Sequence, residues 1–185
     1  MQTKQQIFQL LASADIRPNK RLGQHFLIDL NLMRLLVDKA KIAKVDIVLE
    51  VGCGTGFFTI PVAKLVGPEG HVYAIDSHPL AIEETAKKIH DAGLSNVGLI
   101  KGDATETGLA PDSIDLVLLF GVIPSPTLPL DRLLPRMHRL LKREGALAVW
   151  TALPWWSPAS LTRSGLFAYV GKESGVYGFR KVTND

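Results

Sequence analysis

The chain of 185 residues is 46% apolar and 21% charged, and its formal net charge is +3. This length suits one domain, because a domain of ~150 residues buries roughly 70% of the surface that its unfolded chain exposes. No apolar run reaches the ~18–20 residues of a membrane span, and residues 1–14 lack the basic start and apolar centre of a signal peptide. The single cysteine, Cys53, excludes internal disulfides and a cysteine-based zinc site. We expect one cytoplasmic domain over residues 1–185, without a metal and without membrane contact.

Positive charge is concentrated at the start of the chain. Residues 1–45 contain eight Lys or Arg and three Asp, a net charge of +5, whereas the remainder carries −2. This distribution fits an anionic partner such as RNA at that end, and it fits equally a solvated helix face with surplus lysine. We therefore divide the domain into a basic N-terminal part, 1–45, and a core, 46–185.

Alternating strands and helices are predicted along the chain. Leucines at helical spacing predict a helix over 31–43, and an almost unbroken apolar run predicts a central strand over Ile114–Phe120. The predicted strands are 47–51, 71–75, 97–101, 114–120 and 146–152, and the predicted helices are 31–43, 57–66, 79–92 and 130–142, the last closed by Gly145. Segments 166–170 and 176–181 flank a turn and predict a β-hairpin. This alternation indicates an α/β fold with a mostly parallel sheet covered on both faces.

The glycine-rich turn after the first predicted strand is the most informative motif. Residues 46–56 read DIVLEVGCGTG, in which Gly52, Gly54 and Gly56 follow an apolar run. Parallel α/β sheets build nucleotide sites from a strand, a glycine turn and a helix, because glycine lets the backbone turn tightly and approach a ligand. The third glycine comes one residue too early for the dinucleotide fingerprint G-x-G-x-x-G, which disfavours an NAD enzyme. Glu50 would repel a phosphate and suits a ligand with cationic or hydroxyl groups.

This motif resembles the first motif of the class I S-adenosylmethionine (SAM)-dependent methyltransferases, E-x-G-x-G-x-G, through Glu50, Gly52, Gly54 and Gly56. The resemblance implies a Rossmann-like fold in which five parallel strands and a C-terminal β-hairpin form a seven-stranded sheet. It also implies that the glycine turn lies against the methionine part and the ribose of SAM.

Two acidic residues follow the next two predicted strands. Asp76 comes 20 residues after Gly56, and its two carboxylate oxygens can accept hydrogen bonds from both ribose hydroxyls. The resemblance implies that Asp103 accepts a hydrogen bond from the adenine amine, with Ala104 and Phe120 as further contacts of SAM. The alternatives are a helix cap for Asp76 and an ordinary turn residue for Asp103.

The segment 17–29 reads RPNKRLGQHFLID and resembles the start of the ribosomal RNA adenine dimethyltransferases, K-x-x-G-Q-[NH]-F-L. That resemblance implies that His25 and Leu27 form an N-terminal lid over SAM. It covers residues 17–60 and then fails, because residues 120–124 read FGVIP where that family has Asn-x-Pro followed by an aromatic residue. We expect no counterpart of the family's C-terminal helical RNA-binding domain after the hairpin. From Val72 onward the chain is more similar to the quinone-biosynthesis C-methyltransferases, notably over 112–115 and 140–147.

We expect the methyl acceptor at the ends of the fourth and fifth strands. Segments 120–126 and 153–157 are apolar and aromatic, and they contain no His, Asp, Glu or Lys. Candidate substrate contacts are Ile123, Pro124, Trp155 and Trp156, although we expect at least one of the two tryptophans to cover the core beneath the hairpin. These segments offer no evident base, so the sequence assigns no catalytic residue.

The sequence therefore predicts a SAM-dependent methyltransferase, of class 2.1.1, with an undetermined acceptor and a slight preference for a small molecule. Adenine N-methylation of RNA is the alternative that the basic N-terminal segment and the lid motif favour. A non-catalytic SAM-binding or scaffold protein is an alternative of another class, and the absence of an evident base motivates it.

Overall fold

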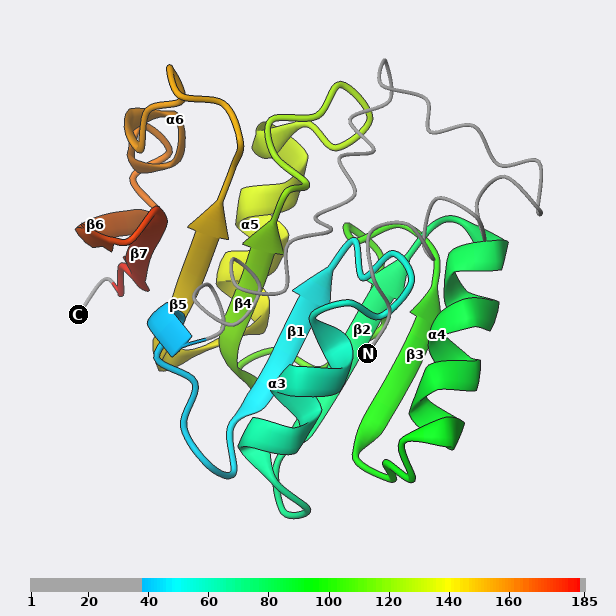
Figure 1. Cartoon of the computed structure of the whole chain (residues 1–185). Coiled ribbons are helices and arrows are strands. Elements are labelled where there is room, and N and C mark those ends of the chain that lie inside the picture. The colour runs from blue at the N-terminus through cyan, green and yellow to red at the C-terminus, as the bar shows by residue number, and fades with distance from the viewer. Residues whose placement is uncertain (1–37, 184–185) are drawn as a thin grey trace.

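The computed structural model describes residues 38–183, and they form a seven-stranded sheet with helices on both faces (Figure 1). The strands are β1 (Ile47–Val51), β2 (His71–Asp76), β3 (Val97–Lys101), β4 (Ile114–Phe120), β5 (Leu141–Trp150), β6 (Phe167–Glu173) and β7 (Val176–Lys181). The helices are α3 (Thr59–Val66), α4 (Pro79–Asp91), α5 (Leu130–Leu140) and α6 (Ala159–Thr162). The strand order is β3-β2-β1-β4-β5-β7-β6; β1 to β5 run parallel, and β7 runs antiparallel to β5 and β6. The predicted mostly parallel sheet with a C-terminal hairpin is confirmed.

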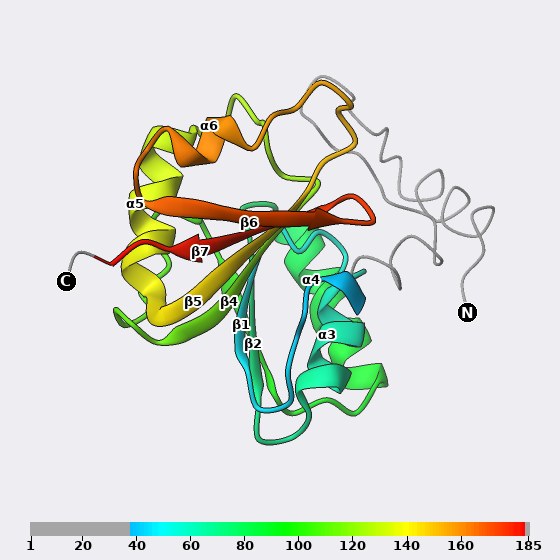
Figure 2. The same cartoon turned by 90° about the vertical axis from the view of Figure 1, so that its left-hand side faces the viewer.

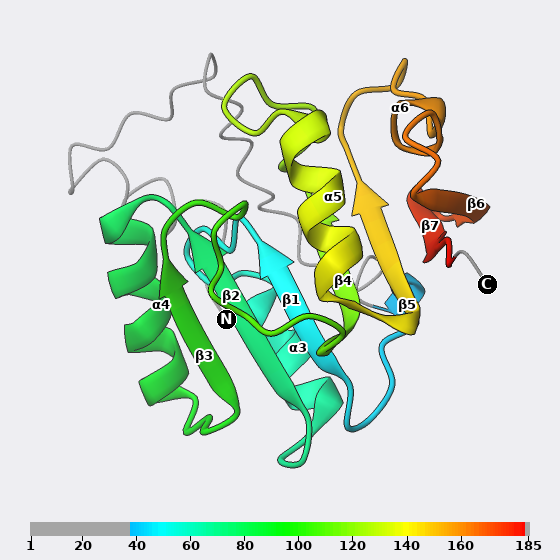
Figure 3. The same cartoon turned by 180° about the vertical axis from the view of Figure 1, so that it is seen from behind.

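The helices divide between the two faces of the sheet. α3 and α4 lie on one face and α5 lies on the other, as Figures 2 and 3 show. Alternate residues of β4 serve the two sides: Val117 and Leu119 belong to the core that includes α5, whereas Leu116 and Leu118 belong to the core that includes α3. Because both faces of β4 are buried, its sequence is an almost unbroken apolar run.

The chain reverses its direction across the sheet between β1 and β4. β2 and β3 follow β1 toward one edge, whereas β4 and β5 continue toward the other edge. Ligands of open α/β sheets bind beyond the carboxyl ends of the strands at such a reversal. The turn that follows β1 and the segment that follows β4 both lie there, so the topology places the site where the glycine motif predicts it.

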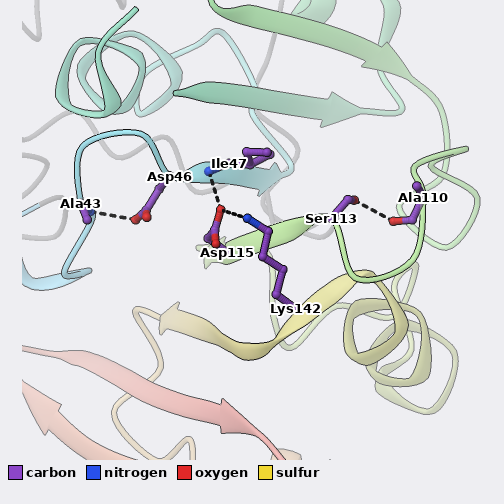
Figure 4. A network of polar contacts seen from close by, with 7 residues as sticks. All are labelled: Ala43, Asp46, Ile47, Ala110, Ser113, Asp115 and Lys142. Atoms are coloured by element: carbon purple, nitrogen blue, oxygen red, sulfur yellow. Dashed lines mark hydrogen bonds and ion pairs between the residues drawn. The ribbon is translucent and has the colours of Figure 1, made fainter. Parts of the chain in front are cut away.

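The opposite ends of the same strands are tied by a polar network around Asp115 (Figure 4). Its Oδ2 atom accepts a hydrogen bond from the backbone N–H of Ile47 at 2.9 Å and one from Lys142 Nζ at 2.8 Å. These three residues lie at the beginnings of β4, β1 and β5, respectively. The network therefore stabilises the amino-terminal edge of the parallel sheet, away from the glycine turn.

Several predicted boundaries were wrong, and the largest differences concern the ends of two helices. The helix predicted over 130–142 ends at Leu140, and β5 begins at Leu141, so Gly145 lies inside a strand and does not close the helix. Leu141 is extended, with φ −68° and ψ 136°, and it pairs with Ile114 of β4, which starts the strand without an intervening turn. Of the helix predicted over 31–43, only the end lies in the described residues. It stops at Lys39, because Lys41 adopts a left-handed conformation with φ 56°.

Over residues 38–183, no helix combines the length and the apolar character needed to cross a membrane.

Candidate functional site

The glycine turn after β1 needs glycine for two different reasons. Gly52, Gly54 and Gly56 all have positive φ, at 71°, 54° and 76°. A Cβ atom on Gly52 would lie 2.2 Å from Val122 Cγ1, and one on Gly56 would lie 3.0 Å from Thr85 Cγ2. A Cβ atom on Gly54 would have no neighbour within 4 Å. The turn is therefore packed against the chain at its two ends and open at its centre.

Asp76, the last residue of β2, holds the centre of the glycine turn. Its Oδ2 atom accepts a hydrogen bond from the backbone N–H of Gly54 at 2.9 Å, and its Oδ1 atom accepts one from the N–H of His78 at 2.9 Å. The N-cap residue of α4 is His78, whose side chain makes no capping hydrogen bond, so the alternative of Asp76 as the helix cap was wrong. Each carboxylate oxygen keeps a further lone pair that can accept a hydrogen bond from a ligand.

Two side chains of α4 bind the glycine turn, and the sequence did not predict them. Thr85, which is fully buried, donates its hydroxyl hydrogen bond to the Gly54 carbonyl at 2.9 Å. Lys88 donates from Nζ to the Thr55 carbonyl at 2.7 Å, and burial lowers the pKa of its ammonium group. Thr85 is the buried residue of α4, and it lies three residues after Ile82 and four before Ile89. A threonine at helical spacing between two isoleucines is the sequence signal that could have revealed the contact.

Glu50 lies in β1 beneath the turn and is 2% exposed. Thr59 Oγ1, in the first residue of α3, donates a 2.6 Å hydrogen bond to its Oε2 atom. Burial raises the pKa of Glu50 to about 8; the bond from Thr59 opposes this shift, and the charge of Asp76 adds to it. The carboxyl group is therefore mostly protonated at neutral pH, and it joins β1 to α3.

Asp103 lies in the segment after β3 and is exposed. Its Oδ1 atom accepts hydrogen bonds from the backbone N–H and the hydroxyl of Thr105, both at 2.8 Å, and these bonds lower the pKa of the carboxyl group. Its Oδ2 atom has no hydrogen-bond partner within residues 38–183. Ala104 is buried beside it. The geometry leaves one acceptor oxygen for an external donor.

Of the residues predicted near the methyl acceptor, at the ends of β4 and β5, some are buried and others are exposed. Phe120 is buried and forms an edge-to-face contact with Phe58, with ring centroids 5.1 Å apart, and Ile123 is 2% exposed. Trp156 is 8% exposed and packs edge-to-face on Tyr177 of β7 at 4.9 Å, which confirms that one tryptophan covers the core beneath the hairpin. Trp155 is 76% exposed. Pro124 is exposed as well.

His25 and Leu27, the predicted lid residues, lie outside the described residues. In the described part of the chain, no group of three or more His, Cys, Asp or Glu could hold a metal ion.

Residues 42–164 match the protein family described as "Methyltransferase domain". The chain belongs to this family. Aklanonic acid methyltransferase DauC of Streptomyces sp. (strain C5) is 39% identical over 98 residues, which are 53% of this chain and 44% of DauC. Demethylmenaquinone methyltransferase of Listeria monocytogenes is 38% identical over 102 residues, which are 55% of this chain and 42% of that protein. The matches thus cover less than half the length of these two relatives.

The methyltransferase domain also shares its fold with solved structures. The SAM-dependent methyltransferase from Aquifex aeolicus superposes with a TM-score of 0.66 at 20% identity, covering 94% of this chain and 96% of that one. At 20% identity, the superposition shows that the two chains share a fold and nothing further. The predicted class I SAM-dependent methyltransferase fold is confirmed, and so is the similarity to quinone-type methyltransferases.

Proposed function

We propose that this methyltransferase domain binds SAM at the carboxyl ends of β1, β2 and β3 and transfers its methyl group to a small acceptor. The observation that carries the proposal is the hydrogen bond between the Asp76 carboxylate and the backbone N–H of Gly54. This bond holds a carboxylate at the end of β2 directly against the open centre of a glycine turn. A ligand lying on the turn would meet this carboxylate.

The residues present fit the parts of SAM. The bare centre of the turn lets a ligand approach the backbone at Gly54. Asp76 keeps acceptor capacity for ribose hydroxyls, and Asp103 keeps one oxygen without a partner for the adenine amine. These acceptors lie at the carboxyl ends of two neighbouring strands of the sheet, β2 and β3. We place the predicted contacts Ala104 and Phe120 at the periphery of the same site.

Bound SAM would supply a methyl group on a sulfonium, which is already activated for displacement. The tasks left to the protein are to align the acceptor with the methyl group and to exclude water. The segments after β4 and β5 contain no His, Asp, Glu or Lys from 120 to 126 or from 153 to 157. The proposed reaction therefore uses an acceptor that loses its proton without help from those segments.

A small, flat acceptor is the class that we favour. Pro124 and Trp155 are exposed next to the ends of β4 and β5, and an exposed indole offers a face for stacking. Aklanonic acid and demethylmenaquinone, small molecules, appear in the names of the two relatives above. Ile123 and Trp156 are buried, so we assign them to the floor beneath the acceptor.

RNA is the second candidate acceptor. Two observations favour RNA: the positive charge of residues 1–45 and a row of arginines on α5. Arg132, Arg136 and Arg139 follow one another at spacings of four and three residues, so they share one face of the helix. None of them forms an ion pair with another residue in the range 38–183. Unpaired arginines of this spacing suit a phosphate backbone.

Isothermal titration of the full chain with SAM and with S-adenosylhomocysteine tests the donor site. We expect both ligands to bind, and the absence of binding for both would contradict the proposal.

A second experiment identifies the acceptor class. The chain is incubated with methyl-labelled SAM and, separately, with extracted metabolites, RNA or protein, and the label is then measured in each fraction. Label in the metabolite fraction supports the small acceptor. Label in RNA, lost in an R132Q/R136Q/R139Q variant but kept in a K64Q/K87Q control, would establish the second candidate instead. SAM binding without any transferred label would establish a non-catalytic SAM-binding protein.

A further inference from the structure

We propose that Thr85 and Lys88 of α4 are positioning residues of the donor site, which hold the glycine turn so that the Thr55 N–H faces the carboxylate of the donor. The proposal rests on the proposed function, because it assigns a role within the same SAM site. Neither residue touches the open side of the turn. Both act on it from the side of α4, through carbonyl groups of two successive residues.

The first step concerns the peptide group between Gly54 and Thr55. Thr85 Oγ1 binds its carbonyl oxygen at 2.9 Å, so the carbonyl points toward α4. In a trans peptide the N–H points the opposite way, so the Thr55 N–H faces away from α4. It has no hydrogen-bond partner within residues 38–183, and Thr55 is only half-buried. A backbone N–H without a partner, on a residue that is only half-buried, is suited to an anionic ligand group.

The second step concerns the peptide groups on either side, whose N–H groups already have hydrogen-bond partners. The Gly54 N–H is bound by Asp76 at 2.9 Å. The Gly56 N–H is bound by the Cys53 carbonyl at 3.0 Å, and the carbonyl of the same peptide group is bound by Lys88 at 2.7 Å. From Gly54 to Gly56, therefore, the Thr55 N–H is the donor left open in the described structure. It is also the donor whose direction Thr85 fixes.

The third step concerns charge and packing beneath the turn. Lys88 is half-buried and has no acidic partner within 4 Å in the described chain. Glu84, one helical turn earlier, acts on it from a longer distance, so the positive charge of Lys88 is only partly offset. A cation behind the turn favours an anion in front of it, because the partly buried charge is weakly screened. Thr85 also fills the space beside Gly56, where its Cγ2 atom would lie 3.0 Å from an added Cβ. The two side chains thus fix the turn by hydrogen bonds, charge and contact.

The test compares two ligands, of which only one carries the amino-acid part with its anionic carboxylate. S-adenosylhomocysteine has a carboxylate and an ammonium group on the chain attached to its sulfur, whereas methylthioadenosine has the same nucleoside and a methyl group in place of that chain. For Thr85→Val, which keeps the shape and loses the hydroxyl donor, and for Lys88→Met, we expect an about tenfold weaker affinity for S-adenosylhomocysteine. The affinity for methylthioadenosine should stay unchanged, and Thr85→Ser should restore most of the loss for S-adenosylhomocysteine.

Lys142→Met is the matched control, because Lys142 is another partly buried lysine with a short hydrogen bond, at the opposite edge of the sheet. It should lower the thermal unfolding temperature and leave both affinities unchanged. Equal losses for the two ligands in the Thr85 and Lys88 variants would overturn the proposal in favour of a general loosening of the fold. Unchanged affinity for S-adenosylhomocysteine would overturn it too. If the unmodified chain binds neither ligand, the proposed function itself fails, so the two failures are distinguishable.

Discussion

The carboxylate of Asp76 and the backbone N–H of Gly54 are joined by a 2.9 Å hydrogen bond, although 22 residues separate them in the chain. The bond links the end of β2 to the turn that follows β1. It gives Asp76 two roles, because the same group shapes the turn and carries the acceptors proposed for the ribose. The carboxylate of Asp103 links no distant segments, since its hydrogen bonds within residues 38–183 are to Thr105, two residues away.

Alanine substitutions at these two positions should therefore differ in their effect on stability. Asp76→Ala removes a bond to a partly buried N–H, and we expect it to lower the free energy of unfolding by about 1–3 kcal/mol and to abolish detectable SAM binding. Asp103→Ala should change stability by less than about 0.5 kcal/mol and weaken SAM binding about tenfold. Urea unfolding and calorimetric titration of both variants provide the measurements. An Asp103 variant that unfolds as easily as the Asp76 variant would contradict this division.

The glycines of the turn should respond unequally to alanine. At Gly52 a Cβ atom would lie 2.2 Å from Val122 Cγ1, so Gly52→Ala combines backbone strain with a clash, and we expect it to cost about 1–3 kcal/mol more than Gly54→Ala. Adding Val122→Ala to the Gly52 variant should recover part of that difference, because it removes the clashing methyl group. Chemical denaturation of the three variants measures this. No recovery in the double variant would show that the backbone conformation, rather than Val122, sets the cost.

The sequence predicted the sheet well because its strands are apolar runs bounded by glycine and acidic residues. Ile114–Phe120 and Val97–Lys101 match the structure at both ends. The junction at Leu141 was missed because a glycine four residues later resembles a helix stop, and pairing with Ile114 overrides that local signal. Among the candidate site residues, Trp155 and Trp156 could not be told apart from the sequence, since their exposure depends on the hairpin that packs over one of them.

Contacts between distant segments were the least predictable part of the site. Thr85 and Gly54 are 31 residues apart, and helical periodicity tells which face of α4 turns inward without telling what it meets. Glu50 was expected to attract a cation as a carboxylate. Its burial beneath the turn could not be read from the motif, and this burial changes the expected charge state.

Glu50 should make stability decrease as the pH rises. Its pKa in the folded chain is about 8, above its ordinary value of 4.5, so between these values the folded state holds a proton that the unfolded state has released. Stability is therefore highest below pH 4.5 with respect to this group and falls as the pH rises toward 8, with a slope of up to about 1.4 kcal/mol per pH unit. Glu50→Gln stays neutral throughout and should flatten this slope. Urea unfolding of both chains from pH 6.5 to 8 measures the difference between their slopes, which isolates the contribution of Glu50. An unchanged slope in the Gln variant would show that Glu50 is ionised in the folded chain.

The two neighbouring tryptophans should differ in what their substitution changes: Trp156 should matter for stability, and Trp155 should matter for the reaction with the acceptor. Trp156 is 8% exposed and packs on Tyr177, so Trp156→Ala should lower the free energy of unfolding by about 3–5 kcal/mol. Trp155 is 76% exposed, so Trp155→Ala should change it by less than about 0.5 kcal/mol. If Trp155 stacks on a flat acceptor, its alanine variant should raise KM for that acceptor while SAM affinity is unchanged, and Trp155→Phe should restore most of the loss because the ring face remains. A Trp155→Ala variant with unaltered acceptor kinetics would remove this residue from the acceptor site and leave Pro124 as its exposed apolar neighbour.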